Sequence, residues 1–176
     1  MNFWIQASNP KYTGLYDKED QNLSNAIETI FPMMTEKALV FWKTIYIPLC
    51  YKYDISWMID NILDILEMLR SKSDGEISLQ WASNTFSAVW NIRWMDEEVV
   101  IAPEWYSVLG HTEHLLNSKG AITVLIRSFI SEWKKILGVI IVGLKESGYN
   151  EKNLCGMKRL ISEYNAIESE GVLYNT

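Results

Sequence analysis

The sequence of 176 residues has only two cysteines, four prolines and nine glycines, and it has no long hydrophobic run. Cys50 and Cys155 lie far apart without a CxxC motif, so their spacing is typical neither of a zinc site nor of a redox-active pair. The longest uncharged run, residues 77–92, holds seven polar residues, which excludes a bilayer span. The first residues lack the basic and apolar segments of an export signal, so we expect a cytoplasmic protein without membrane contact.

The overall composition is that of one globular domain. Hydrophobic residues make up 48% of the chain and charged residues 22%, and there is neither an internal repeat nor a low-complexity stretch. We therefore predict a single domain over residues 1–176. The formal net charge of −6 argues against nucleic acids and anionic membranes as partners, because both are bound through Lys and Arg.

Alternation of apolar and polar residues predicts an antiparallel β-meander in the middle of the chain. The expected strands cover residues 77–81, 86–94, 98–102 and 104–109. Pro103 is expected to mark a break or a bulge. Further strands are predicted at residues 3–8 and 38–49. A helix is the alternative for the first half of the segment 38–49.

Apolar residues recur at helical spacing in four other segments. The expected helices cover residues 23–30, 54–71, 119–147 and 151–167, and the tail from residue 168 is expected to fray. Asp54 is predicted to cap the second helix, and Gly148 to follow the end of the third. Because the meander has one polar face, the layer rule predicts an α+β fold in which helices cover one face of the antiparallel sheet.

Negative charge is concentrated in the predicted meander. Residues 76–117 contain six acids and a single base, Arg93. Asp96, Glu97 and Glu98 fall at one predicted turn, and Glu104 follows closely in the sequence. Such a concentration of charge creates a field that can steer a basic partner.

No catalytic or metal-binding motif stands out. His111 and His114 form an HxxH pattern in a predicted loop, with Glu113 between them, but the order differs from the HExxH zinc motif. Nucleotide-binding, kinase and nucleophile-elbow motifs are lacking. We therefore predict no catalytic residue, no metal and no cofactor, and the chain is not expected to be an enzyme.

The sequence contains eight tryptophans, which is many for its length. Four of them lie on the apolar phase of their predicted elements and are assigned to the core: Trp81, Trp90, Trp94 and Trp133. Trp105 and Tyr106 follow Pro103 and Glu104, and these two aromatic residues are candidates for interface anchors. Aromatic residues interleaved with basic ones would indicate RNA binding, but this region has one arginine only.

Several strings of the sequence resemble a known group of proteins. They are NPKYTGLYD at 9–17, IYIPLCYKYDIS at 45–56, WASNTF at 81–86 and EWK at 132–134. Together they are similar to small cytoplasmic immunity proteins of bacterial contact-dependent growth inhibition and related polymorphic toxin systems. The resemblance implies a protein that binds the C-terminal toxin domain of a delivered effector, often a nuclease, and blocks its active site.

The charge pattern is compatible with such a role, because a nuclease cleft that attracts phosphate is commonly basic. The predicted binding surface consists of Asp96, Glu97, Glu98, Glu104, Asp17, Glu19 and Asp20, with Trp105 or Tyr106 as the anchor. We expect a complex of one immunity protein with one folded toxin domain. A secretion chaperone, which would be a homodimer that binds an unfolded segment, is the first alternative, and an enzyme using His111, Glu113 and His114 is the second.

Overall fold

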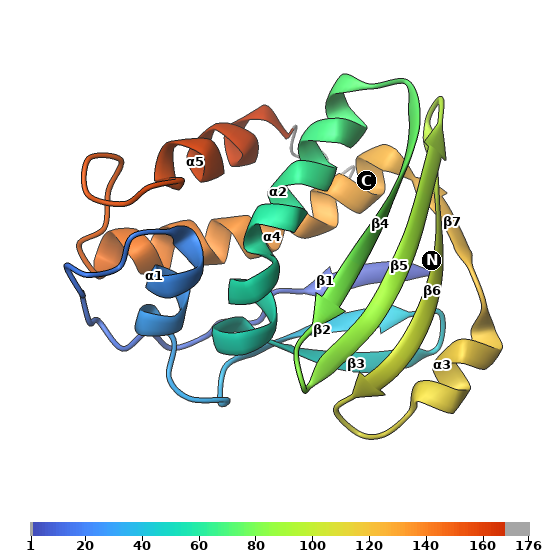
Figure 1. Ribbon diagram of the computed structural model, residues 1–176, viewed down its shortest axis with the longest axis horizontal. Coiled ribbons are helices and arrows are strands. Elements are labelled where there is room, and N and C mark those ends of the chain that lie inside the picture. The colour runs from blue at the N-terminus through green and yellow to red at the C-terminus, as the bar shows by residue number, and fades with distance from the viewer. Residues whose placement is uncertain (1, 168–176) are drawn as a thin grey trace, which may run out of the picture.

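Two antiparallel sheets form the β part of the protein, which is described for residues 2–167 in this computed structural model (Figure 1). The smaller sheet has the strand order β1 (Phe3–Gln6), β2 (Lys37–Trp42), β3 (Ile45–Cys50). The larger sheet has the order β4 (Asp74–Ala82), β5 (Phe86–Met95), β6 (Glu98–Val108), β7 (Ile122–Leu125). The predicted α+β class is confirmed, although two sheets take the place of the single sheet that we expected.

Five α-helices and one π-helical turn complete the described residues. They are α1 (Leu23–Ile30), the turn η1 (Tyr51–Ile55), α2 (Ser56–Ser71), α3 (Glu113–Lys119), α4 (Ile126–Glu146) and α5 (Met157–Ala166). In Figure 1, α2, α4 and α5 lie together on one side of the larger sheet, and the smaller sheet lies next to the larger one. Within residues 2–167, no helix is both long and apolar enough to span a bilayer.

Several predicted boundaries are correct. The helix at 23–30 coincides with α1, and Asn22 caps it by accepting the Asn25 N–H at 3.0 Å. Gly148 follows the end of α4 with a φ of +97°, as predicted. The strands of the meander appear as β4, β5 and β6, each somewhat longer than expected. The predicted frayed tail, 168–176, lies outside the described residues.

Other predictions are wrong, and several of them fail because strands pair with distant segments of the chain. The segment 38–49 is a hairpin of two strands, which turns at Lys43 with a φ of +56°. Pro103 does not interrupt β6, in which it lies opposite Trp90. The register shifts three residues later instead, at Tyr106, which has no partner between Ser87 and Ala88 of β5. The helix expected from residue 119 begins only at Ile126, because residues 122–125 pair with β6 as β7. The last helix starts at Met157 rather than at residue 151.

Asp54 does not cap α2. It lies fully buried in the π-helical turn. Its carboxylate accepts the N–H of Cys50, four residues earlier in the chain, at 2.6 Å and the Thr85 hydroxyl at 2.7 Å. The Ser83 hydroxyl donates to the same carboxylate. Asp54 therefore joins the start of α2 to the turn between β4 and β5 instead of satisfying the first N–H groups of the helix.

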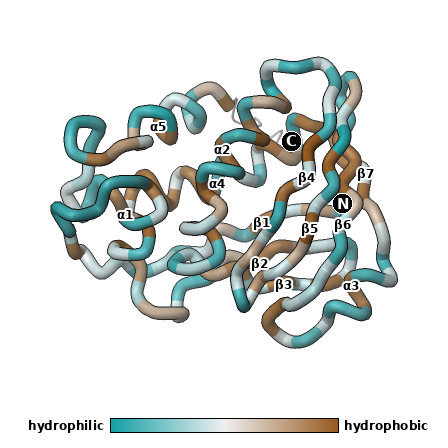
Figure 2. The backbone as a smooth tube through the Cα atoms, in the orientation of Figure 1, coloured by the Kyte–Doolittle hydropathy of each residue, from teal (hydrophilic) through white to brown (hydrophobic). Residues whose placement is uncertain are grey.

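An aromatic cluster fills the space between the two sheets and α4. Trp90 lies at its centre, with ring centroids 5.6 Å from Trp42, 5.2 Å from Trp81 and 5.9 Å from Trp105. Five buried indole N–H groups have no hydrogen-bond acceptor within residues 2–167, those of Trp42, Trp81, Trp90, Trp105 and Trp133. Figure 2 shows apolar residues along α4 and through the strands, whereas most of the connecting loops are hydrophilic. The predicted core positions of Trp81, Trp90, Trp94 and Trp133 are confirmed.

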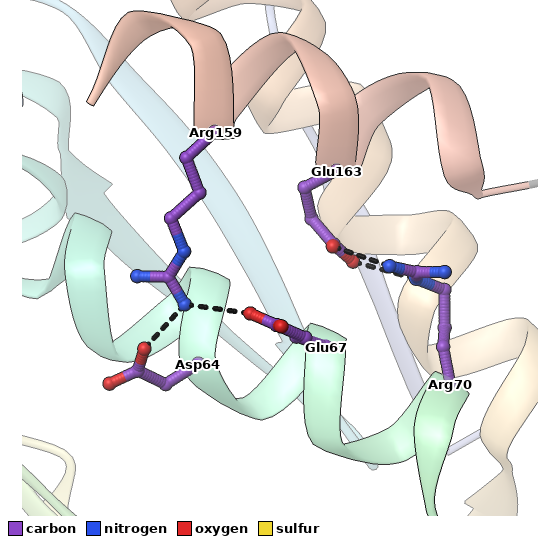
Figure 3. A network of polar contacts seen from close by, with 5 residues as sticks. All are labelled: Asp64, Glu67, Arg70, Arg159 and Glu163. Atoms are coloured by element: carbon purple, nitrogen blue, oxygen red, sulfur yellow. Dashed lines mark hydrogen bonds and ion pairs between the residues drawn. The ribbon is translucent and has the colours of Figure 1, made fainter.

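Two arginine–carboxylate contacts hold α5 against α2 (Figure 3). Arg70 of α2 donates to both oxygens of Glu163 at 2.8 and 2.6 Å, and the Glu163 side chain is only 6% exposed. This hydrogen bonding raises the pKa of Arg70 above its usual value. Arg159 of α5 bridges Asp64 and Glu67 of α2 at 2.5 and 3.1 Å in a more exposed position.

Candidate partner-binding face

The larger sheet has one face that none of the described helices covers. Along β4, β5 and β6 the side chains alternate between buried and exposed, so the helices and the smaller sheet pack on one face only. The residues of the exposed face are Asp74, Glu76, Ser78, Gln80 and Ala82 of β4, Asn91, Arg93 and Met95 of β5, and Glu98, Val100, Ala102 and Glu104 of β6. We call this set the outer face.

The outer face is hollowed at its centre. The hollow has a volume of about 720 Å³, and its lining combines the ion pair of Glu76 and Arg93 with uncharged residues that include Ser78, Asn91, Val100 and Ala102. Val100 is 39% exposed. A small-residue centre with charged residues around it is the layout of a protein-binding surface, in which an apolar core is surrounded by a polar rim.

Acidic residues predominate around this hollow. Arg93, the one basic residue of the outer face, pairs with Glu76 at 3.4 Å, and both side chains are about three-quarters exposed, at 75% and 74%. Such an exposed pair contributes little to stability. Among the residues that the structure describes, Glu98 and Glu104 have no ion-pair partner. The outer face therefore carries a net negative charge that is available to a partner.

The turn between β5 and β6 has both acidic and basic side chains around it, although its own sequence is acidic. Asp96, with a φ of +54°, and Glu97 are exposed at this turn. They share a hollow of about 240 Å³ with Arg70 and Arg127, which come from α2 and α4. Arg70 is already paired with Glu163, so Arg127 is the arginine left to offset part of the negative charge of the turn. Glu98, at the beginning of β6, and Glu104 carry the uncompensated charge of that strand.

Of the two predicted anchors, Trp105 is buried and Tyr106 is exposed. Trp105 is 3% exposed and packs against Trp42 and Phe86, so it belongs to the core and is not an interface anchor. Its backbone is held by Asn117, which accepts the Trp105 N–H and donates to the Trp105 carbonyl, both at 2.9 Å. Tyr106 is 58% exposed and donates a hydrogen bond to Glu104 at 2.9 Å, which raises the pKa of the phenol. Of the two predicted anchors, only Tyr106 is on the surface.

Asp17, Glu19 and Asp20 lie at the other end of the molecule. Their loop runs beside α1, away from the larger sheet (Figure 1). The Tyr149 hydroxyl accepts the Asp17 N–H at 3.0 Å and donates to the Asp20 carboxylate. The prediction that this loop joins the surface of the meander is therefore wrong, because the fold places the two acidic segments apart and uses Asp20 to fasten its own loop.

The loop contact predicts a measurable pH dependence. Burial, together with the hydrogen bond to Asp20, raises the pKa of Tyr149 to about 12. Because the folded protein favours the neutral phenol, this contribution to stability is complete below pH 10 and is lost as the pH rises through 12. Tyr149→Phe should therefore show a smaller decrease in unfolding free energy than the unmodified protein between pH 10 and 12, measured by urea denaturation. An identical decrease in both proteins would contradict the assignment.

The histidine motif does not assemble into a site. His111 is in the turn after β6, whereas His114 lies in α3 rather than in the predicted loop. Glu113 accepts the Val108 N–H at 2.7 Å, and such backbone hydrogen bonds lower the pKa of its carboxyl group. No group of three or more His, Cys, Asp or Glu side chains is placed to hold a metal ion within residues 2–167.

Sequence reasoning missed a second hollow, which lies where α2 begins beside the turn between β4 and β5. Its volume is about 360 Å³, and it is lined by Met34, Tyr53, Trp57, Ala82, Ser83, Asn84 and Thr85. Trp57 is 63% exposed, although it was not among the predicted anchors. A signal was present in the sequence, because Trp57 is out of phase with the apolar stripe of α2.

No family model, curated protein or solved structure matches this chain.

Proposed function

We propose that this protein is an immunity protein, which binds a basic toxin domain through the outer face of its larger sheet and thereby blocks the toxin's active site. The partner would be the C-terminal domain of a delivered effector, most simply a nuclease, bound as one copy to one copy in the cytoplasm. The observation that carries this proposal is an uncovered sheet face that is acidic at its rim and small-residue at its centre.

The dimensions of the outer face suit a protein partner. β5 has 10 residues, so the face is about 33 Å long, and its three long strands span about 10–15 Å. The face alone therefore measures about 330–500 Å², and the neighbouring turns would have to supply the rest of the roughly 800 Å² that each partner contributes to a standard interface. Tyr106, at one end of β6, supplies an exposed aromatic group of the kind that often anchors such interfaces.

The charges of the face suit a basic partner. Glu98 and Glu104 are six residues apart on β6, or about 20 Å, and both point outward. Two carboxylates at this separation can meet different basic groups of a phosphate-binding cleft. Charged groups at a rim mainly accelerate association, whereas a carboxylate that becomes buried against a basic group contributes to the lifetime of the complex. The strings that resemble immunity proteins support the same role.

A matched pair of charge reversals tests this proposal. Glu98→Lys with Glu104→Lys should reduce the association rate with the toxin domain encoded beside this gene by about tenfold or more at low salt, and should flatten the salt dependence. Surface plasmon resonance at several salt concentrations provides the measurement, and growth rescue on co-expression provides the functional readout. Asp17→Lys with Glu19→Lys changes the net charge equally but lies at the other end of the molecule, so it should have a much smaller effect. Equal effects of the two pairs would contradict binding through the outer face.

A further inference from the structure

The hollow beside the start of α2 has the chemistry of a site for a single cationic side chain. Its floor is the turn between β4 and β5, with Ser83 and Thr85, and its wall includes the exposed indole of Trp57. Asp54 lies directly behind the floor and is 0% exposed.

The hydroxyl groups of the floor can only accept hydrogen bonds from a ligand. A serine or threonine hydroxyl has one proton, and Ser83 and Thr85 both direct theirs to the Asp54 carboxylate. The remaining donor to this carboxylate is the Cys50 N–H at 2.6 Å, so all three donors are neutral. Within the described residues, Asp54 forms no ion pair. The Ser83 oxygen also accepts the Thr85 N–H at 3.1 Å, so the floor offers a ligand the remaining lone pairs of the two hydroxyl oxygens, with a negative charge behind them.

The wall suits a planar cation. The Trp57 indole N–H donates to Glu28 at 3.2 Å, which fixes the ring and brings a second carboxylate close to it. The ring face is available for a cation–π contact, which is strongest for tryptophan. Lys52 is the nearby resident cation, but its ammonium group donates to the carbonyls of Glu28 and Phe31 and lies 5.8 Å from the Tyr53 ring. Lys52 therefore occupies the Tyr53 side and leaves the Trp57 side open.

We propose that this hollow binds an arginine side chain of a protein partner, with the guanidinium stacked on Trp57 and its N–H groups directed to Ser83 and Thr85. Arginine is favoured over lysine because its planar fork stacks on aromatic rings and serves several acceptors at once. Ala82, which also lines the hollow, belongs to β4, so an arginine bound here would come from a partner that contacts the larger sheet near this edge.

The test uses a small probe without any partner, so its outcome is separate from that of the charge reversals on the outer face. Nα-acetyl-arginine amide should shift the NMR signals of the Trp57 indole N–H and the Thr85 amide in a saturable way, with a dissociation constant on the order of 1–10 mM. Nα-acetyl-citrulline amide has nearly the same shape without the charge and should bind at least about tenfold more weakly.

Two variants complete the test. Trp57→Ala removes the exposed ring and should abolish saturable shifts of Thr85. Tyr46→Ala removes a ring that is 56% exposed on the smaller sheet and should leave the binding unchanged. Saturable binding of arginine that is weakened by Trp57→Ala alone would support the site. Equal binding of citrulline, persistence of binding in Trp57→Ala, or absence of saturable shifts would overturn it.

Discussion

Trp90→Ala is expected to lower the unfolding free energy by about 3–5 kcal/mol. Trp90 is 1% exposed and touches aromatic rings of both sheets, at centroid distances of 5.6 Å to Trp42, 5.2 Å to Trp81 and 5.9 Å to Trp105. Alanine would leave a cavity that rigid neighbouring rings cannot fill by a rotamer change. Since a domain of this size is stable by about 5–15 kcal/mol, the variant should be close to the limit of folding.

Urea denaturation followed by circular dichroism measures this effect. Trp57→Ala is the matched control, because the same truncation at a side chain that is 63% exposed should change the stability by less than about 1 kcal/mol. A small loss for Trp90→Ala would mean that the cluster does not join the two sheets. If Trp90→Ala cannot be purified, Trp90→Phe should still show a partial loss of stability, since it retains a ring at the centre of the cluster.

Arg70→Met is expected to destabilise the protein by about 3 kcal/mol. The substitution keeps the apolar stem of the side chain but leaves the Glu163 carboxylate, whose side chain is 6% exposed, without its two hydrogen bonds from Arg70. Most of the loss comes from the unpaired buried carboxylate rather than from the attraction within the pair. Adding Glu163→Met to Arg70→Met should therefore restore most of the stability, as measured by urea denaturation.

The neighbouring contact between the same two helices provides the control for Arg70→Met. Arg159 and Asp64 have side chains that are 39% and 46% exposed, so Arg159→Met should lower the stability by less than about 1 kcal/mol. If the double variant at Arg70 and Glu163 were as unstable as Arg70→Met, the loss would have to come from packing of the arginine stem. That result would contradict the role assigned to the buried carboxylate.

Local patterns in the sequence were sufficient for the elements whose periodicity is unambiguous. The segment at 23–30 has both a capping asparagine and a clear apolar stripe. Buried and exposed residues alternate along β4 and β5, and along β6 as far as Tyr106. Residues 122–125 were assigned to a helix because Ile122 and Leu125 fit the helical period. Their pairing with β6 is a contact between distant parts of the chain, which periodicity cannot reveal.

The turns were harder to predict because their usual residues are missing. Lys43 turns the hairpin of β2 and β3 with a positive φ, although lysine is not a typical residue for this conformation. Asp54 has the sequence context of a helix cap, but its partners Ser83 and Thr85 are about thirty residues away in the chain. The hollow next to Trp57 was missed for the same reason, since three separate segments contribute to it.

The candidate site was predicted in part. Glu98 and Glu104 lie on one exposed face because they have the same parity along β6, whereas Tyr106 is exposed at the register shift, where it has no partner on β5. Trp105 has the opposite parity and is buried, which the alternation could have indicated once the strand was taken to continue through Pro103. The position of Asp17, Glu19 and Asp20 depends on the tertiary structure, so their separation from the outer face was not accessible from charge alone.

Covalent labelling of carboxylates, with and without the bound toxin domain, tests the central claim most directly. The exposed side chains of Glu98 and Glu104 should be labelled in the free protein and protected in the complex. Asp60 and Glu151, which are exposed on α2 and before α5, should be labelled equally in both states. Protection of Asp60 or Glu151 with unchanged labelling of Glu98 and Glu104 would show that the partner binds elsewhere and would contradict the role assigned to the outer face.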